Sequence, residues 1–484
     1  MRAFETPTLY PTLRVLSDEQ VRDIHYATLE ILGQIGVDMQ DPQGRQLLLQ
    51  AGAWESNGRI RIPENMLTDA IASAPSRIPM YDRLGNLSMP LELGKVFFGM
   101  GSDTIFTMDV NTGERRQALA QDVEDIARLG DALENFDFVM SMGVPSDAPV
   151  KDTFLHGFIR MIRGSAKPNV YTAQDRKDME DIYRIAVAVA GGEQALREKP
   201  FLLLYAEPIS PLLINEESLQ KIIFCAEKGI PSAYIPSPNT GGGGPITLAG
   251  AIAVGNAECL VGLIISQLVR PGAPFLYGMN TAALDMKTTI VSYGSPEWSL
   301  GMAAWTELAR TYTLPVWGYG GATDSKVVDA QAGIEATFSI YNALLSRCTL
   351  VHDVAYIEYG STSSMEMMVI ADEIISMARR FMQGVPVNEN TLALDTIAKV
   401  RPGSGFLAED HTLDNFREAQ WSPKLIDRKR YDLWEAAGSK DMFARANERA
   451  RKTLAKHISA PLPDEAEALI GDILNERRAA EKDS

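Results

Sequence analysis

Short apolar segments recur eight times between residues 96 and 385, and a helical pattern of apolar positions follows each of them. Most of these segments run into Gly, Pro, Ser or Asp, which are the residues that end strands and begin turns. The segments cover residues 96–103, 138–147, 169–174, 201–208, 231–236, 274–280, 314–321 and 349–356. Apolar runs that alternate with helices predict βαβ units and a parallel sheet.

The number of units indicates the architecture. Eight units favour a closed (β/α)₈ barrel, with an open doubly wound sheet as the alternative. The connecting segments support this, because Val123, Ile126 and Leu129 recur on one face of residues 122–133. We therefore predict an α/β protein with a barrel catalytic domain at residues 96–385.

Two further segments flank the predicted barrel. Residues 1–95 read as an N-terminal cap of mixed α/β structure, in which Ser17 and Gln20 form a capping box that predicts a helix from residue 18. Residues 386–484 are more polar and end in a charged helical pattern at 464–482. They predict a helical C-terminal extension that packs on the barrel or on a partner.

Composition excludes several classes of function. The net charge of −17 argues against a nucleic-acid partner, because phosphate binding needs a basic surface. The most apolar stretch, residues 248–269, contains Asn256, Glu258 and Gln267, which indicates a buried helix and not a membrane span. The N-terminus has no apolar signal-peptide core. The three cysteines follow no metal-binding or disulfide spacing, so we expect free thiols and a cytoplasmic protein.

Glu207 is the most conspicuous polar residue at a predicted strand end. In a parallel barrel the active site lies at the carboxyl ends of the strands. Glu207 ends an otherwise apolar strand and precedes Pro208, so its charge needs a partner or a bound cation. A functional carboxylate is one interpretation, and a buried ion pair that closes the barrel end is the other.

His352 is the one histidine of the five that falls at a predicted strand end. It is a second candidate for the chemistry, with a core histidine whose hydrogen bonds are satisfied as the alternative. Asp353 follows it directly. Neighbouring strand residues point to opposite faces, so we do not expect these two side chains to form a pair.

Other strand-end residues complete the set of candidates. The polar ones are Asp103, Asn280, Asp324 and Lys326, and the aromatic ones are Tyr205, Tyr277, Trp317 and Tyr356. The sequence has no P-loop, no HExxH or GxSxG motif and no cluster with metal-ligand spacing, so we predict no metal site.

An ordered set of motifs resembles a known family. FFGMGSDT, FVMSMGVPSD, YAEPISPL, SYGSPE, ATDSKVVDAQAGIEA and LVHDVAYIEYG follow one another as in the trimethylamine methyltransferase family. The resemblance extends from LSDEQVRDIHYATLEILGQIGV to YDLWEAAGSKDMFARANERA, and so covers nearly the whole chain.

This resemblance implies a (β/α)₈ barrel that transfers a methyl group from a small methylated amine to the Co(I) of a separate corrinoid protein. The trimethylamine-specific members carry pyrrolysine. This sequence holds only the twenty standard residues, and therefore looks like the branch that acts on quaternary amines such as glycine betaine. The chain itself is expected to bind no cofactor, because the cobalamin arrives on the partner.

The resemblance also suggests roles. Glu207 would face the ammonium group, His352 would bind the polar tail of the substrate, and aromatic walls would hold the cation by cation–π attraction. Lys326 is the best cationic candidate for an anionic tail, with an ordinary surface lysine as the alternative. Two other functions stay open: a barrel lyase or isomerase that uses Glu207 and His352, and a non-catalytic methylated-amine-binding protein. Homo-oligomerisation is compatible with the terminal segments.

Overall fold

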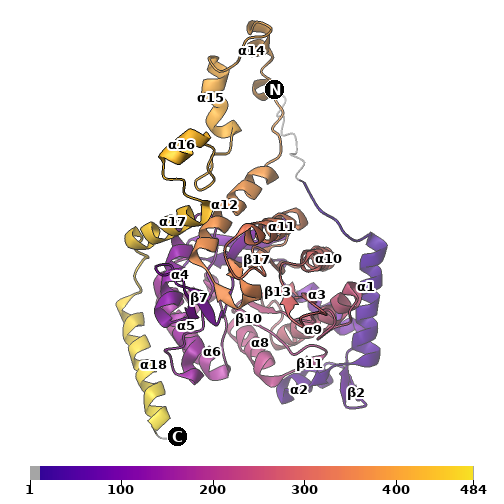
Figure 1. The fold of residues 1–484 in the computed structure, drawn as a ribbon. Coiled ribbons are helices and arrows are strands. Elements are labelled where there is room, and N and C mark those ends of the chain that lie inside the picture. Colours follow the sequence, from indigo (N-terminus) through magenta and orange to yellow (C-terminus); the bar gives the residue numbers. More distant parts are fainter. Residues whose placement is uncertain (1–10, 483–484) are drawn as a thin grey trace.

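The computed structural model describes residues 11–482, and a seven-stranded parallel sheet forms its centre (Figure 1). Every neighbouring pair in this sheet is parallel. Its strands in spatial order are β6 (Phe97–Met100), β17 (Leu350–Val354), β16 (Val316–Tyr319), β13 (Phe275–Gly278), β12 (Ser232–Tyr234), β10 (Leu202–Ala206) and β9 (Asn169–Tyr171).

Two residues close this sheet into a barrel. Phe138 forms a parallel bridge with Gly99 in β6, and Val139 forms one with Asn169 in β9. The segment at Phe138–Val139 therefore occupies the eighth position, between the first and last strands of the sheet. The structure confirms the predicted (β/α)₈ barrel.

The second strand is much shorter than the expected segment 138–147. After Val139 the chain bends, because Met142 has a φ of 28° and Gly143 and Pro145 follow. Proline has no backbone N–H and cannot continue a ladder of hydrogen bonds. The remainder of this segment forms a loop at the carboxyl end of the barrel.

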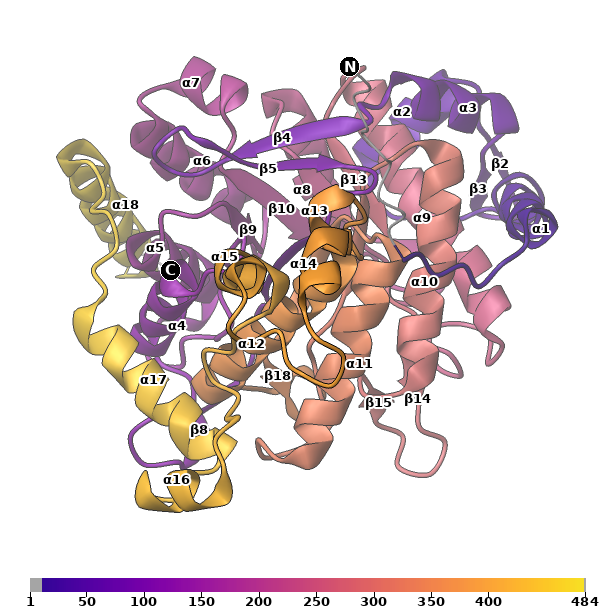
Figure 2. The same cartoon turned by 90° about the horizontal axis from the view of Figure 1, so that it is seen from above.

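A ring of helices surrounds the barrel (Figures 1 and 2). One long helix follows each strand position in turn: α4 (Ala120–Ala132), α5 (Thr153–Gly164), α6 (Arg176–Ala190), α8 (Glu216–Lys228), α9 (Leu248–Val269), α10 (Pro296–Tyr312), α11 (Ala330–Ser346) and α12 (Met365–Met382). The short helices η2 (Val150–Asp152) and α7 (Glu193–Glu198) precede α5 and follow α6.

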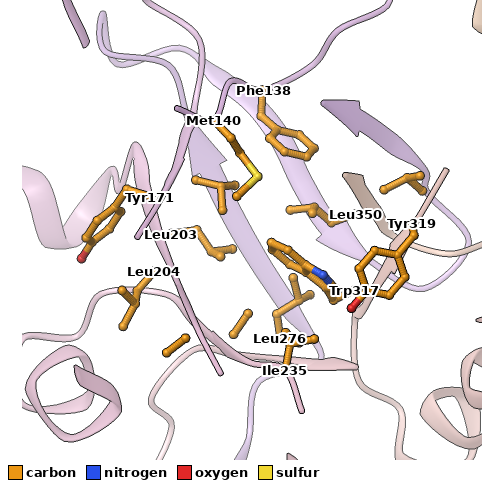
Figure 3. Close-up of a cluster of buried hydrophobic side chains, with 14 of the residues drawn as sticks. Phe138, Met140, Tyr171, Leu203, Leu204, Ile235, Leu276, Trp317, Tyr319 and Leu350 are labelled. Atoms are coloured by element: carbon orange, nitrogen blue, oxygen red, sulfur yellow. The ribbon is translucent and has the colours of Figure 1, made fainter. Parts of the chain in front are cut away.

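Buried side chains fill the interior of the barrel, and Figure 3 shows them converging from successive strands. They include Met140, Leu203, Ile235, Leu276, Trp317 and Leu350, all of which are fully buried. Side chains alternate along each strand, so Leu203, Tyr205 and Glu207 share one face of the chain around β10. The packed interior thus leads directly to the polar residues at the carboxyl end.

The N-terminal segment forms a mixed α/β cap. The capping box of α1 is present, since the Gln20 backbone N–H donates to Ser17 Oγ and the Ser17 N–H donates to Gln20 Oε1. The cap contains α1 (Asp18–Glu30), the π-helix η1 (Ile31–Ile35), β1 (Asp38–Met39), α2 (Pro42–Gln50), β2 (Trp54–Ser56), β3 (Arg59–Arg61), α3 (Glu64–Ser73), β4 (Arg77–Tyr81) and β5 (Leu87–Glu92).

The hairpin β4–β5 covers the amino end of the barrel (Figure 2). The Tyr81 N–H donates to Pro200 O at 2.9 Å, and the Arg83 N–H donates to Ala166 O at 2.8 Å. Pro200 and Ala166 lie just before β10 and β9, so these bonds tie the hairpin to the end of the barrel where the strands begin.

Short strands occupy the opposite, carboxyl end. A four-stranded sheet joins β18 (Tyr356–Ile357), β19 (Thr362–Ser363), β7 (Phe106–Met108) and β8 (Arg115–Gln117), and η3 (Glu358–Gly360) lies beside it. A hairpin of β14 (Ala283–Leu284) and β15 (Val291–Ser292) follows β13, and β11 (Leu213–Ile214) pairs with β1. These loops form the rim of the barrel mouth.

The apolar helix α9 lies inside the protein. By length and composition it is the one helix among residues 11–482 that could cross a membrane, but most of its residues are buried against α1, α3, α8 and β13. The three cysteines, Cys225, Cys259 and Cys348, are also buried and unpaired, as predicted.

Glu258 is a buried carboxylate within α9. Its Oε2 accepts a hydrogen bond from Ser210 Oγ at 2.7 Å, and its Oε1 accepts one from the Leu212 N–H. Burial raises the pKa of Glu258 to about 7. Because Ser210 and Leu212 follow β10, Glu258 anchors the loop that comes directly after Glu207.

The C-terminal extension has two parts. Helices α13 (Glu389–Leu392), α14 (Leu394–Lys399) and α15 (Asp410–Ala419) project away from the barrel, α16 (Tyr431–Ala436) follows them, and exposed apolar residues such as Leu394 and Leu413 lie along this arm (Figure 1). Helices α17 (Met442–Lys456) and α18 (Asp464–Lys482) return to pack on α4 and α12 and on α6.

A buried arginine attaches α18. Arg477 Nε donates to Asp181 Oδ2 at 2.7 Å and Arg477 Nη1 donates to Asp152 Oδ1 at 3.0 Å, while Nη2 lies 3.0 Å from Asp178 Oδ1. All four side chains are buried or nearly so. One guanidinium therefore joins three carboxylates, of which Asp181 also pairs with Arg184.

We expect Arg477→Ala to detach α18, because it removes the guanidinium that joins this helix to Asp152, Asp178 and Asp181. Removing one partner from a buried ion pair costs about 3–5 kcal/mol. Hydrogen exchange should show strong loss of protection in α18, whereas Arg478→Ala, at the exposed neighbouring position, should leave protection unchanged. Equal protection in both variants would contradict this role of Arg477.

We expect Glu258→Gln to change how stability depends on pH. Glutamate ionises in the unfolded chain near pH 4.5 but only near pH 7 when folded, so the stabilising contribution of the protonated form is complete below pH 4.5 and is lost as pH rises to 7. The wild type should lose about 3 kcal/mol relative to the variant across this range. Unfolding midpoints at pH 5 and pH 8 measure the difference, and Glu297→Gln on the exposed start of α10 is the control. A gap between wild type and variant that is independent of pH would refute the prediction.

Candidate active site

Glu207 lies at the carboxyl end of β10, in the barrel mouth. The Tyr205 hydroxyl donates a hydrogen bond to Glu207 Oε1, and Ser237 Oγ donates to the same oxygen at 3.4 Å. Solvent reaches this side chain through the mouth, yet protein surrounds it closely enough that desolvation raises its pKa. Asp353 and Asp103 also raise this pKa, while Tyr205 and His352 oppose them.

A continuous stack of aromatic rings leads away from Glu207. Tyr205 stacks on Trp317 with ring centroids 4.9 Å apart and planes 3° from parallel. His352 lies 4.4 Å from Trp317 and 4.7 Å from Tyr319. Tyr319 then contacts Trp298, which stacks on Tyr293 at 4.9 Å. We call these six residues the aromatic stack; Figure 3 shows Trp317 and Tyr319 lying side by side within it.

Two predicted polar residues hold the outer rings of this stack. Asn280 Oδ1 accepts a hydrogen bond from Trp298 Nε1 at 3.1 Å. Asp324 accepts bonds from the Tyr293 backbone N–H, at 2.8 Å, and from Ser292 Oγ. Asn280 and Asp324 thus fix Trp298 and the loop that carries Tyr293, and they do so from the ends of β13 and β16.

His352 and Asp353 lie together, which corrects the expectation that they would point apart. His352 Nδ1 is 2.8 Å from Asp353 Oδ1, although the two atoms are not aligned as a hydrogen bond. The pairing register shifts between Val351 and Val354, and Asp353 has a φ of 70°. This left-handed conformation breaks the strand alternation on which the expectation rested.

Both ring nitrogens of His352 are buried and have no hydrogen-bond partner among residues 11–482. The ring is buried and contacts the rings of Tyr205, Trp317 and Tyr319. A satisfied core histidine, the alternative considered above, does not describe this residue either.

Asp103 follows β6 and lies across the barrel mouth from Glu207, which follows β10. Its Oδ1 accepts hydrogen bonds from Ser141 Oγ at 2.8 Å and from Thr172 Oγ1 at 3.2 Å. Desolvation raises its pKa, and these hydroxyls together with Lys221 act against that shift. Tyr356 closes this side, since its hydroxyl donates to the backbone oxygen of Ser102.

Two predicted residues lie away from this group. Tyr277 points outwards from β13, where its hydroxyl donates to Asn256 Oδ1 at 2.8 Å and its ring packs on Tyr312. Lys326 is exposed on the rim; its Nζ donates to Asp324 O at 2.8 Å and lies 5.5 Å from the centre of the Tyr359 ring. Lys326 therefore resembles the surface lysine of the alternative interpretation.

Sequence reasoning missed several residues of the site. Tyr319 belongs to the strand-end aromatic residues but was given no role, although strand alternation places it on the same face as Trp317, two residues away. Tyr293 lies in the loop between β13 and α10, and Lys221 reaches the mouth from α8, positions that carry no strand-end signal. Asp353 was excluded by the very alternation that its backbone breaks.

Carboxylates beside aromatic faces suit an alkylated ammonium ion. Each aromatic ring can contribute about 0.5–2 kcal/mol to binding such a cation, and more when water is excluded. Glu207, with Tyr205 beside it, offers both features at one place. No group of three or more His, Cys, Asp or Glu residues that could hold a metal ion occurs within residues 11–482.

Comparison with known proteins gives one consistent result. The profile of the family described as "Trimethylamine methyltransferase (MTTB)" matches residues 4–482. Trimethylamine methyltransferase MttB of Desulfitobacterium hafniense strain DSM 10664 / DCB-2 is 33% identical over 465 residues, which is 95% of this chain and 93% of that protein. Glycine betaine methyltransferase of D. hafniense strain Y51 is 31% identical over 473 residues, which is 97% and 98% of the two chains.

A further relative and a solved structure agree with these matches. Trimethylamine methyltransferase MttB of Methanosarcina thermophila is 34% identical over 457 residues, which is 93% of this chain and 94% of that one. The crystal structure of the Methanosarcina barkeri monomethylamine methyltransferase superposes with a TM-score of 0.52 at 13% identity, covers 91% of this chain and 88% of its own, and supports the fold. The chain belongs to the trimethylamine methyltransferase family, and is thus an enzyme of the methylamine:corrinoid methyltransferase kind.

Proposed function

We propose that this enzyme transfers a methyl group from a quaternary methylammonium compound, the class that includes the betaines, to the Co(I) of a corrinoid held by a separate protein. The observation that carries the proposal is the carboxylate of Glu207, hydrogen-bonded by the Tyr205 hydroxyl beside the aromatic stack, in the barrel mouth of a family member. The comparisons do not select the amine, because relatives named for trimethylamine and for glycine betaine are similarly distant.

The chemistry of the leaving group favours a quaternary amine. In the transfer the N–CH₃ bond breaks and its electron pair stays on nitrogen, while the Co(I) electron pair forms the new Co–CH₃ bond and cobalt becomes formally Co(III). A quaternary ammonium then leaves as a neutral tertiary amine without any added proton. The sequence holds only standard residues, and therefore lacks the pyrrolysine that the trimethylamine-specific branch carries.

The chain contributes binding and orientation to this step. Glu207 balances the charge of the ammonium, and Tyr205 and Tyr293 present aromatic surfaces that solvent can reach. Asn280, Asp324 and His352 are positioning residues, since they hold the aromatic stack and Asp353. Alignment of the methyl carbon and exclusion of water account for the rate, because cobalt supplies the nucleophile.

The partner's position follows from the barrel. A corrinoid protein must present its cobalt at the carboxyl end, since Glu207 opens there and β4–β5 cover the other end. We place the enzyme in the cytoplasm, where its buried unpaired thiols are compatible with reducing conditions. Self-association of the chain stays a prediction.

The test is an anaerobic assay with a reduced corrinoid protein and a panel of glycine betaine, proline betaine, carnitine, choline and trimethylamine. Conversion of Co(I) to methyl-Co(III), followed by absorbance, is expected with a quaternary amine and not with trimethylamine. Glu207→Gln should lower kcat/KM about 10- to 100-fold, because it removes the counter-charge. Tyr277→Phe is the matched control, since Tyr277 faces away from the mouth, and should retain transfer. Equal loss in both variants, or transfer from trimethylamine alone, would reject the proposal.

Tyr205→Phe should shift the pH dependence of the reaction upwards. The Tyr205 hydroxyl stabilises ionised Glu207 and lowers its pKa, so its removal raises that pKa further. Substrate binding requires the carboxylate, and kcat/KM should therefore rise with pH in both enzymes but at a higher midpoint in the variant. A pH profile that keeps the wild-type midpoint would show that Glu207 does not control binding.

A further inference from the structure

We infer that the substrate is a methylammonium cation whose non-reacting end carries no negative charge. Three carboxylates gather around the mouth, while the lysines nearby, Lys221 and Lys326, are bonded to backbone oxygens and the imidazole of His352 lies against Asp353. This inference rests on the proposed function and narrows its substrate class to compounds such as a hydroxyalkyl trimethylammonium. It predicts that such monocations bind more tightly than zwitterionic betaines.

Two of the three carboxylates are held at strand ends by unusual backbone. Asp103 has a φ of 56° and Asp353 a φ of 70°, both in the left-handed region that residues other than glycine seldom adopt. Residues held in such a conformation cluster at functional sites. They follow β6 and lie in β17, which are paired neighbours, so the two carboxylates flank one side of the mouth.

Asp103 and Asp353 act electrostatically on the same group of tyrosines as Glu207 does. Burial and the Asp353 and Glu207 carboxylates together raise the pKa of Tyr293 and of Tyr319. Burial, Asp353 and Asp103 raise the pKa of Tyr356 in the same way. The aromatic surfaces that would hold a cation thus lie in the combined field of all three acids.

His352 is an independent sign that this region is built for a ligand and not only for packing. It is buried, and neither ring nitrogen has a hydrogen bond within residues 11–482. His352 contacts Asp353 and lies between Trp317 and Tyr319. Its imidazole, which lacks hydrogen bonds within this described part of the chain, is therefore packed against the aromatic stack of the proposed cation site.

The lysines near the mouth are already engaged. Lys221 Nζ donates to Ala173 O at 2.7 Å and interacts with the carboxylates of Glu217, Asp103, Asp178 and Glu207. Lys326 is exposed and bonded to Asp324 O. A carboxylate tail would therefore meet like charges in a partly desolvated site, whereas a hydroxyl could donate a hydrogen bond to Asp103 or Glu207.

Choline and glycine betaine form a matched pair for the test, since they share the trimethylammonium group and differ in a hydroxymethyl or a carboxylate. Isothermal titration of the full chain at pH 8, without corrinoid, should give choline an affinity about tenfold or more above that of glycine betaine. Tetramethylammonium, which has no tail, should bind more tightly than glycine betaine as well.

Asp353→Asn tests the cause of this preference. Asparagine tolerates a positive φ as aspartate does, so the substitution removes the charge and keeps the backbone. The ratio of choline to betaine affinity should fall about threefold or more, and Asp103→Asn should act in the same direction. Asp472→Asn, on the exposed face of α18, is the control for net charge and should leave the ratio unchanged.

The outcomes separate this inference from the proposed function. Tighter binding of glycine betaine than of choline, with methyl transfer from glycine betaine to corrinoid, overturns the inference and leaves the function in place. A preference for choline that Asp353→Asn and Asp472→Asn alter equally also overturns it, because the acids then do not set the specificity. Binding of neither compound overturns the inference and the proposed function together.

Discussion

Barrel closure at Phe138 and Val139 is the constraint on which the rest of the structure depends. Two parallel bridges, to Gly99 and to Asn169, remove both edges of the seven-stranded sheet. Once closed, the sheet directs alternate side chains inwards, so Tyr205, Trp317 and His352 meet although more than a hundred residues separate the first from the others. The aromatic stack is therefore a product of topology, and no local segment of the sequence could form it alone.

Charge and aromatic surface act together because of this convergence. A carboxylate in an apolar site is costly unless it meets a cation, and Glu207 has hydroxyl donors but no ion pair within residues 11–482. Under the proposed function, an ammonium ion in the mouth would relieve the unfavourable desolvation of Glu207, Asp103 and Asp353. Part of the binding energy for such a cation would come from carboxylates that the folded protein has already placed there.

The spacing of apolar residues allowed much of the fold to be predicted. The residues that it misassigned are mostly those whose position within a strand differs from the expected alternation of faces. The eight strand positions followed from apolar spacing, the capping box at Ser17 from its cap residues, and the buried helix α9 from polar residues within an apolar stretch. Glu207 and Trp317 were found because strand ends concentrate function. Tyr277 was assigned to the mouth although it lies one residue out of phase with Leu276, and Asp353 was left out because no spacing rule anticipates a left-handed residue within a strand.

The hairpin β4–β5 gives the barrel a single usable entrance. In the part of the chain that the structure describes, the amino end is covered and the interior is filled by Leu203, Ile235, Leu276 and Leu350, so a small molecule approaches Glu207 from the carboxyl end. A second macromolecule that must reach the same place would cover that entrance. The reaction would then follow a compulsory order, with the amine entering first and its demethylated product leaving last.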